Sequence, residues 1–388
     1  MKIAIVTDHF LPRVGGAEYA SHCLAAALTD RGHEVTVIAP DLKVSEIVTR
    51  YKIIRSINSR FFSSTLSCAF AVKKLKGNRK PDIIHAQLLF PAGKKILPYA
   101  QYANIPLLVS PQGADIHTFA PMNYGLLLQN KYQYKVKRIL RRLNAVTYSS
   151  RLMKQLVIDN GFHGKHLHYL PNGTFTSYFF HNKRQQFRDF FKFPNNSIII
   201  TTVSRHSPIK GLSLLIQALR RLPSDLPEWH AIIAGSNVDK LTDEIHEAGL
   251  LNRVRLMANL PFEYDGNNIP IIPSPTIANL LVASDIYAAP ALSGGFELSS
   301  ADAIAAALPT VIFDENGSKD IIEDTNAGIV VPTGDIDAFS RALATIIRDY
   351  PLRCAMRSNA LVSASNLDWH MIAQQAEQIY NNILTTQG

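Results

Sequence analysis

Short apolar runs alternate along the chain with longer stretches whose apolar residues recur at helical spacing. The first half opens with the run KIAIVT, a helical stretch up to Gly32, and the run EVTVIAP. Further apolar runs follow at residues 81–85, 105–110 and 145–150. Runs that are apolar throughout are typical of strands buried on both faces, as in parallel sheets. The pattern therefore predicts a parallel sheet covered by helices.

The same pattern restarts after residue 196. Its apolar runs lie at 197–203, 230–235, 253–258 and 285–290, with a helical stretch at 212–222. The aromatic and basic stretch 176–193 predicts a connection between two domains, and 388 residues exceed what one core usually holds. We expect a domain over 1–180, a second domain over 181–367, and a closing helix over 368–388 that returns to the first domain.

One amphipathic helix is predicted from Leu126 to Leu143. Four cations form one stripe along it, and an apolar stripe adjoins them; the cations are Lys131, Lys135, Arg138 and Arg142. Such a helix suits the surface of an anionic membrane. A solvated basic face above an ordinary core contact explains the same pattern, and the sequence does not decide between the two.

The net charge of +9 is unevenly distributed. Residues 1–180 contain 24 Lys and Arg against 9 Asp and Glu, whereas 181–388 contain 16 against 22. The run KKLKGNRK at 73–80 adds to the basic half. A basic half suits nucleic acid, an anionic membrane or an acidic acceptor. Because it lacks the aromatic interleaving of a known recognition module, nucleic acid is not expected as a partner.

Metal ligands and membrane-spanning segments are not expected either. The three cysteines are far apart and form no CxxC or Cys/His cluster. No apolar run approaches the roughly 18 residues of a membrane helix, and the amino terminus does not resemble a signal peptide. A cytoplasmic protein is the expectation.

Residues 291–309 predict a strand, a turn at Gly294-Gly295, and an Ala-rich helix that stops at Pro309. Such an element directs backbone N–H groups and the positive end of a helix dipole toward one point, which suits a phosphate. Asp302, expected in the first helical turn, lies within reach of a ligand hydroxyl. Alternatively, Ser299 to Asp302 form a capping box that satisfies only the helix itself.

Two cations, Arg205 and Lys210, follow the first strand of the second half. They are expected at the carboxyl edge of the sheet, where open α/β sheets bind ligands, and they suit an anion such as a diphosphate. Unliganded surface cations are the alternative. Gly15-Gly16 follow the first strand of the chain, but a glycine pair without the full GxGxxG pattern also fits a tight turn alone.

Together these segments resemble the group 1 (family 4) glycosyltransferases, which are retaining enzymes of the GT-B fold. The resemblance lies in Gly15-Gly16, RGHEVTVIAP, PNGTF, SRHSPIKG, and the segments 294–309 and 317–335. It implies two Rossmann-like doubly wound domains facing across a cleft. It further implies a nucleotide-diphosphate sugar as donor in the second domain, and a glycan or lipid-linked acceptor at the first. Neither a metal nor another cofactor is implied.

The resemblance also assigns roles to residues. Arg205 and Lys210 hold the donor's diphosphate, and Asp302 accepts the ribose hydroxyls. The remaining donor-site positions are Gly15, Gly16, Gly295, Phe296, Glu297, Leu298 and Ser299. Gln112, Asp115 and Asn172 fall on the acceptor side.

Several positions depart from the family pattern. Gly294 stands where the family has the first glutamate of a pair, and Asp302 stands in place of the second. Glu297 replaces a glycine, Gln112 replaces a histidine, and Ala307 replaces the glycine before Leu-Pro. Glu297 is the only acid in its turn, so it is a candidate catalytic residue with Arg205 and Lys210, and would hold the donor sugar. A solvent-facing side chain, or a charge at the N-terminus of the following helix, is the alternative.

The expected function is a retaining hexosyltransferase of polysaccharide or lipopolysaccharide synthesis, peripheral at the inner face of the cytoplasmic membrane. The departing phosphate would take the acceptor's proton, because no side chain is evident as a base. The alternative is a catalytically degenerate subunit that binds a sugar nucleotide. The lost glutamate favours this second hypothesis, while the retained Arg205, Lys210 and Asp302 favour the first.

Overall fold

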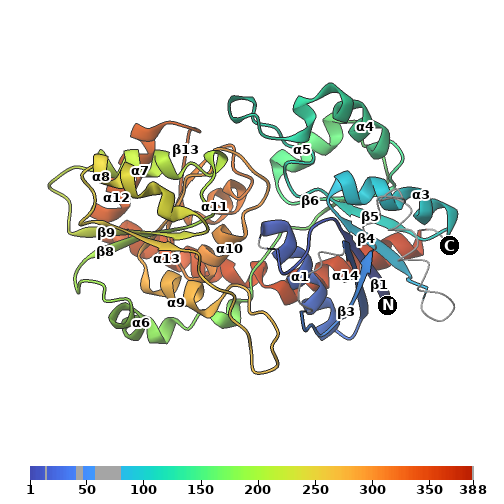
Figure 1. The fold of residues 1–388 in the computed structure, drawn as a ribbon, viewed down its shortest axis with the longest axis horizontal. Coiled ribbons are helices and arrows are strands. Elements are labelled where there is room, and N and C mark those ends of the chain that lie inside the picture. Colours follow the sequence, from blue (N-terminus) through green and yellow to red (C-terminus); the bar gives the residue numbers. More distant parts are fainter. Residues whose placement is uncertain (14, 41–46, 57–79, 387–388) are drawn as a thin grey trace. The chain divides into compact units, whose positions relative to one another are not determined.

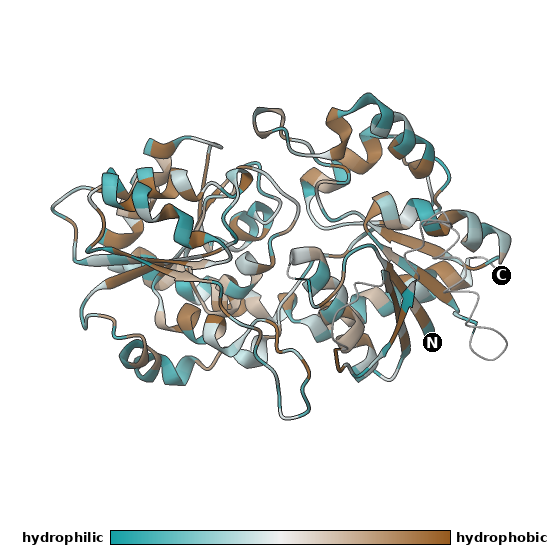
Figure 2. Ribbon diagram, in the orientation of Figure 1, coloured by the Kyte–Doolittle hydropathy of each residue, from teal (hydrophilic) through white to brown (hydrophobic). Residues whose placement is uncertain are grey.

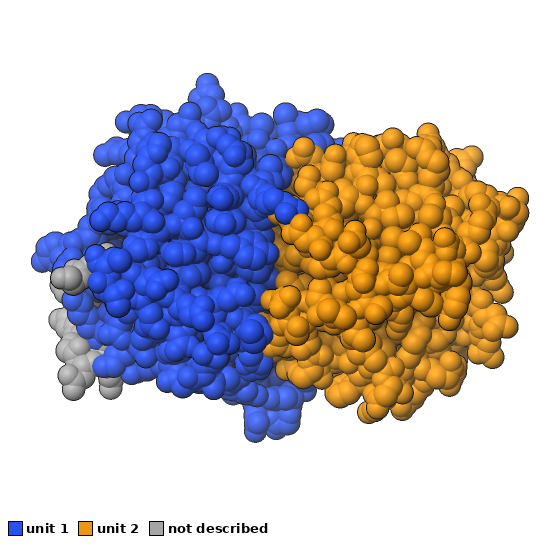
Figure 3. All heavy atoms as spheres, turned by 180° about the vertical axis from the view of Figure 1, so that it is seen from behind, with its two compact units in different colours: residues 1–173, 264–272, 369–388 blue, residues 174–263, 273–368 orange. Residues whose placement is uncertain are grey.

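The computed structural model describes residues 1–13, 15–40, 47–56 and 80–386, arranged in two compact units. Unit 1 consists of residues 1–173, 264–272 and 369–388, and unit 2 of residues 174–263 and 273–368 (Figures 1 and 3). Both units are α/β, as the alternating pattern predicts. Within the basic run at 73–80, only Lys80 belongs to the described residues.

Unit 1 contains a parallel sheet of seven described strands, in the order β3-β2-β1-β4-β5-β6-β7. In chain order these strands are β1 (Lys2–Thr7), β2 (Glu34–Pro40), β3 (Lys52–Ser56), β4 (Ile83–Gln87), β5 (Leu107–Ser110), β6 (Ala145–Tyr148) and β7 (His166–Tyr169). Its described α-helices are α1 (Gly16–Asp30), α3 (Lys94–Tyr102), α4 (Asn130–Leu140), α5 (Arg151–Asp159) and α14 (Trp369–Thr385). The central strands are buried, and Figure 2 shows them as predominantly hydrophobic.

The carboxyl-terminal helix α14 packs against α1 in unit 1. At its amino end Trp369 is buried, and further along Tyr380 hydrogen-bonds through its hydroxyl with Nδ1 of His85 at 2.7 Å. Arg31, which follows α1, donates from Nε to Glu377 at 2.9 Å. These contacts attach the last helix to the sheet that begins the chain.

Unit 2 contains a parallel sheet in the order β10-β9-β8-β11-β12-β13. Its strands are β8 (Ile198–Val203), β9 (Trp229–Gly235), β10 (Val254–Ala258), β11 (Ile286–Ala289), β12 (Thr310–Phe313) and β13 (Gly328–Val331). Its helices are α6 (Arg184–Phe190), α7 (Leu212–Arg220), α8 (Thr242–Glu247), α9 (Pro275–Ala283), α10 (Leu298–Ala305), α11 (Lys319–Thr325), α12 (Ile336–Arg348) and α13 (Tyr350–Ala364).

The stretch 176–193, predicted as a connection, is instead an integral part of unit 2. It contains α6, and its aromatic residues Phe187, Phe191 and Phe193 are buried in the core of that unit. Arg188 donates to Asp285 at 3.1 Å and to the Ser197 carbonyl at 2.9 Å. The prediction was wrong because burying these rings stabilises a folded helix, within which Arg188 finds partners for its charge.

The single helix predicted over Leu126–Leu143 was also wrong at its ends. Leu126–Leu128 form a 3₁₀ turn, Gln129 is extended, and α4 runs only from Asn130 to Leu140. The N–H of Leu126 donates to the Ala114 carbonyl at 2.8 Å. This contact ties Leu126 to the loop after β5, so residues 126–128 do not continue α4.

The turn that follows helix α10 contains an alanine in a conformation that favours glycine. Ala307 has a φ of +57°, and the N–H groups of Ala307 and Leu308 donate to the Ile304 and Ala303 carbonyls, both at 2.9 Å. This is the Schellman arrangement, in which the left-handed position is usually glycine. Ala307 therefore carries backbone strain of about 1 kcal/mol at the position where the family pattern has glycine.

Candidate functional site

The two loops at the topological switch point of unit 2 form the candidate site. The chain passes from β8 to β9 and β10 on one side, then returns to place β11 on the other side of β8. The loops after β8 and β11 therefore leave the same sheet edge at adjacent positions, where open α/β sheets bind ligands. Arg205 and Lys210 lie in the first loop, and Gly294 to Glu297 lie in the second.

A glycine brings the two loops into contact. Gly211 has a φ of +62°, and a Cβ placed on it would lie 2.0 Å from the Pro290 carbonyl oxygen. Lys210 ends a 3₁₀ turn immediately before this glycine, and the N–H of Leu292 donates to the Ile209 carbonyl at 2.9 Å. Only glycine allows this approach, so the lysine-glycine pair fixes Lys210 beside the second loop.

Glu297 is held by three residues from two other loops. One carboxylate oxygen pairs with Nζ of Lys210, and the other accepts from Nδ2 of Asn316 at 2.7 Å. Its backbone N–H donates to Oγ of Ser318 at 2.8 Å, while the N–H of Ser318 donates to Oδ1 of Asn316 at 3.0 Å. The predicted alternative of a solvent-facing side chain was wrong, because Glu297 is only 11% exposed.

Arg205 differs from Lys210 in its surroundings. It lies in the same loop and is exposed, whereas Lys210 is 23% exposed and paired with Glu297. A guanidinium is planar and binds phosphate in a bidentate manner, which suits an exposed cation at a ligand edge. The loop thus offers one accessible cation and one that already has a carboxylate partner.

Glu297 is the N-cap of α10, which begins at Leu298. The capping box predicted as an alternative over Ser299 to Asp302 is therefore wrong, since the helix starts before it. Asp302 consequently lies in the second turn rather than the first. The amino end of α10, formed by Leu298, Ser299 and Ser300, carries partial positive charge at the same sheet edge as Arg205.

Gly294 in the second loop leaves space where the family pattern has a carboxylate. A Cβ placed on Gly294 would meet no atom within 4 Å. The N–H of Gly317 donates to the Gly294 carbonyl at 3.2 Å, so this backbone is fastened to the loop after β12. Gly295 and Phe296 beside it are buried. The position thus has room for a ligand group that a side chain would otherwise contact.

Asp302 is 9% exposed in α10. Burial raises the pKa of its carboxyl to about 7. Near neutral pH the group is therefore partly protonated in the ligand-free protein. A polar ligand hydroxyl that donates to Asp302 would favour its ionised form.

Replacing Asp302 by Asn should flatten the dependence of stability on pH. Because the pKa is raised on folding, the folded state binds the extra proton, and stability falls as pH rises from about 4 to about 7. Between pH 5 and 8 this amounts to roughly 2–3 kcal/mol for one group. Urea unfolding of wild type and Asp302→Asn at both pH values measures the difference. If wild type and Asp302→Asn lost the same free energy of unfolding between pH 5 and pH 8, a buried, protonated Asp302 would be contradicted.

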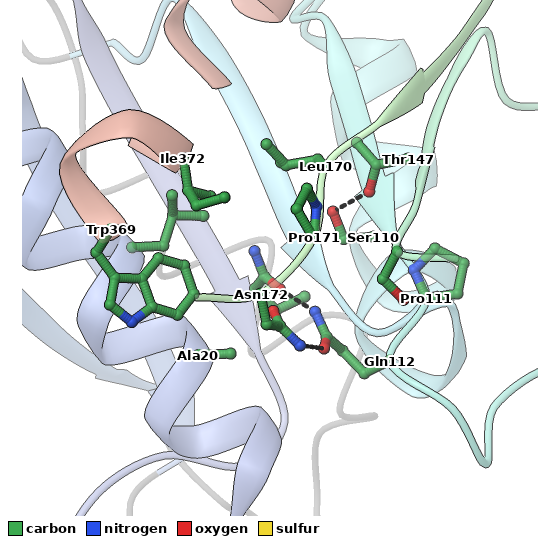
Figure 4. A pocket seen from close by; sticks show the side chains of 13 residues that line it. Ala20, Ser110, Pro111, Gln112, Thr147, Leu170, Pro171, Asn172, Trp369 and Ile372 are labelled. Carbon is green, nitrogen blue, oxygen red and sulfur yellow. Dashed lines mark hydrogen bonds between the residues drawn. The ribbon is translucent and has the colours of Figure 1, made fainter. Parts of the chain in front are cut away.

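In unit 1 a small polar pocket lies at the carboxyl ends of β4 to β7 (Figure 4). Gln112 is held there at both ends, since its Nε2 donates to Gln87 at 2.6 Å and its Oε1 accepts from Asn172 at 3.2 Å. Trp369 and Ala20 line the pocket from α14 and α1. The sequence predicted Gln112 and Asn172 as neighbours of an acceptor, and the structure places them together.

Asp115 has a different environment from these amides. It is buried, and its oxygens accept from the N–H groups of Leu89, Gln112 and Gly113 at 2.6, 3.1 and 2.9 Å. Burial raises the pKa of this carboxyl, while the backbone donors lower it. In the structure Asp115 therefore fastens the loop after β4 to the loop after β5.

Gly15 and Gly16 lie at the start of α1 in unit 1. A Cβ placed on Gly15 would lie 2.4 Å from Oε2 of Glu18, whose side chain is buried against this turn, whereas one on Gly16 would meet no atom within 4 Å. A side chain at Gly15 would displace that carboxylate. The role of the pair in donor binding stays a prediction.

His85 in β4 has a structural role. It is fully buried and hydrogen-bonds with Tyr380 and, at 2.6 Å, with Oγ of Ser110. Burial lowers its pKa to about 3, so it remains neutral. Its partner Ser110 and Gln87, whose Nε2 lies 3.3 Å from Nε2 of His85, line the pocket.

Helix α4 presents a basic surface in unit 1. Lys131, Lys135, Arg138 and Arg142 are exposed, while Val136, Ile139 and Leu140 are buried beneath them. No helix among the described residues is long and apolar enough to cross a bilayer. Nor do the described residues contain a group of three or more His, Cys, Asp or Glu side chains arranged to hold a metal ion.

Two α/β units are typical of the GT-B fold when each contains a parallel sheet whose strand order reverses at one point. Solved structures agree with this class. Sucrose-phosphate synthase from Thermosynechococcus elongatus superposes with a TM-score of 0.81 at 17% identity, covering 99% of both chains. HepE from Anabaena, in complex with UDP and glucose, superposes with a TM-score of 0.75 at 21% identity, covering 98% of this chain and 99% of that one.

Sequence comparison identifies the family. Residues 183–362 match the model of glycosyl transferases group 1, and residues 14–178 match that of glycosyltransferase family 4. The chain is also 23% identical to phosphatidyl-myo-inositol mannosyltransferase of Mycolicibacterium smegmatis, over 99% of this chain and 94% of that protein. The protein thus belongs to the group 1 glycosyltransferases and is a glycosyltransferase. These matches give no support to the alternative of a catalytically degenerate subunit.

Proposed function

We propose that the protein transfers a sugar from a nucleotide-diphosphate sugar, with retention of configuration, to a glycan or lipid-linked acceptor of the cell envelope. The observation that carries this proposal is the convergence of Arg205, Lys210 and the amino end of α10 at the switch point of unit 2. UDP in the HepE complex and the lipid in the mannosyltransferase's name support the donor and acceptor classes.

In this proposal the charge that develops on the leaving diphosphate is neutralised by fixed groups. Arg205 and Lys210 supply cations, and the first N–H groups of α10 supply oriented dipoles. Asp302 accepts the hydroxyls of the ribose. The leaving phosphate oxygen takes the acceptor's proton, so no side-chain base and no metal ion are required.

A transfer assay tests this function. The protein is first screened for thermal stabilisation by nucleotide sugars, and a stabilising donor is then offered with lipid-linked and glycan acceptors in the presence of EDTA. We expect release of the nucleoside diphosphate and a product with the donor's anomeric configuration, read by NMR. An inverted product would overturn retention, and loss of activity in EDTA would overturn metal independence. No stabilisation by any nucleotide sugar would overturn the donor class.

We further propose that the protein acts in the cytoplasm, peripherally at an anionic membrane surface that it binds through α4. The exposed stripe of Lys131, Lys135, Arg138 and Arg142 supports this. Tyr134 on the same helix is 69% exposed, and an exposed aromatic side chain suits the headgroup region. Such a surface would bring a lipid-linked acceptor to the enzyme.

A further inference from the structure

Lys210, one of the two cations assigned to the donor's diphosphate, already has an anion as partner. Its Nζ contacts a carboxylate oxygen of Glu297, and both side chains are mostly buried, at 23% and 11% exposure. A carboxylate and a phosphate are both oxyanions that bind an ammonium group. Glu297 therefore occupies the position on Lys210 that a diphosphate oxygen would take.

This ion pair is more than a chance surface contact. The second oxygen of Glu297 is held by Asn316, which is itself fully buried and oriented by the N–H of Ser318. The backbone of Glu297 is fixed by Oγ of Ser318. A carboxylate held from several sides loses little further side-chain entropy on pairing, so its contact with Lys210 is preorganised.

We propose that Glu297 competes with the donor's diphosphate for Lys210. Binding of a nucleoside diphosphate exchanges the partner of Lys210 from carboxylate to phosphate, and release of the product reverses the exchange. This inference rests on the proposed nucleotide-sugar function. Because Asn316 retains the second oxygen, the released oxygen stays in the turn that also contains the open position at Gly294.

Competition for Lys210 predicts a different effect of Glu297 on nucleotide affinity from the sugar-holding role expected from the sequence. A carboxylate that only held the donor sugar would leave nucleotide affinity unchanged when neutralised. A competitor lowers that affinity, since two like charges cannot both lie against one cation without repulsion. Glu297→Gln, which keeps the size of the side chain and removes its charge, should therefore bind UDP or GDP about 5- to 20-fold more tightly than wild type.

Isothermal titration with UDP and GDP tests the proposal on wild type, Glu297→Gln, Lys210→Ala and the double variant. Glu247→Gln, which removes an exposed charge of α8 in the same unit, is the matched control and should leave affinity unchanged. In the Lys210→Ala background the gain from Glu297→Gln should be at least about 3-fold smaller, because the contested cation is gone. Circular dichroism checks that each variant is folded.

Unchanged or weaker binding in Glu297→Gln would overturn the competition, as would an equal gain in the Lys210→Ala background or in Glu247→Gln. The proposed function would still stand after those results, provided that wild type binds a nucleoside diphosphate and Arg205→Ala binds it more weakly. Wild type that binds neither UDP nor GDP would instead reject the nucleotide site itself, and the competition with it.

Discussion

Exchanging Lys131, Lys135, Arg138 and Arg142 together for Glu should weaken binding to anionic vesicles by about a thousandfold or more. Each basic residue close to such a membrane contributes roughly 1 kcal/mol, so losing four costs at least about 4 kcal/mol. The four side chains are exposed on α4 and its following turn, and residues 130–142 contain no acid that would offset them. Co-sedimentation with vesicles of phosphatidylserine and phosphatidylcholine measures the change.

The result has two controls. Wild-type binding should fall steeply between 50 and 500 mM salt, since the Debye length shortens from more than 10 Å to a few Å. A variant with the same change in net charge in unit 2 should bind like wild type; its positions are the exposed residues Lys192, Arg220, Lys240 and Arg341. Equal binding by wild type and the α4 variant would show that α4 is an ordinary solvated face.

Replacing Arg205 by Ala should weaken binding of UDP or GDP by about 10- to 100-fold. Loss of a charge-assisted hydrogen bond costs on the order of 1.5–3 kcal/mol. Arg205 is exposed in the loop after β8, and in the proposed site it would contact the diphosphate of the nucleotide directly. Isothermal titration of both variant and wild type gives the ratio of their dissociation constants.

Arg220→Ala is the matched control for this effect. Arg220 is also an exposed arginine of unit 2, at the end of α7, so its removal changes the net charge of the unit equally. Its variant should bind the nucleotide as wild type does. If Arg205→Ala kept wild-type affinity, or if both variants lost affinity alike, Arg205 would have no specific contact with the diphosphate.

The sequence predicted most of the buried strands and the edge strand β10, but it missed the buried β12 (Thr310–Phe313) and the edge strand β7. Runs such as KIAIVT and SIIITTV are apolar throughout because their strands are buried on both faces. The edge strand β7 (His166–Tyr169) has the mixed sequence HLHY and is only partly buried, so it gave no such signal. The break before α4 was not predictable either, because it depends on a backbone contact from Leu126 to the distant Ala114.

For the candidate site, the sequence predicted positions but not partners. Arg205 and Lys210 were expected at the carboxyl edge of the sheet because they directly follow a strand, and they lie there. The pairing of Lys210 with Glu297 joins residues 87 positions apart, and Asn316 and Ser318 reach the site from a third loop. The spacing of residues in the sequence does not reveal such contacts. They depend on the strand order, which places β8, β11 and β12 side by side and so brings their following loops to one edge of the sheet.

The most direct test of a nucleotide site at this edge is hydrogen–deuterium exchange with and without saturating UDP or GDP. Bound diphosphate should slow exchange of backbone amides in 204–211 and 290–300, because these loops and the amino end of α10 would contact it. Peptides from α12 (Ile336–Arg348) should be unchanged and serve as the internal reference. Protection confined to unit 1, or no protection at a concentration that stabilises the protein, would contradict a donor site between the loops after β8 and β11.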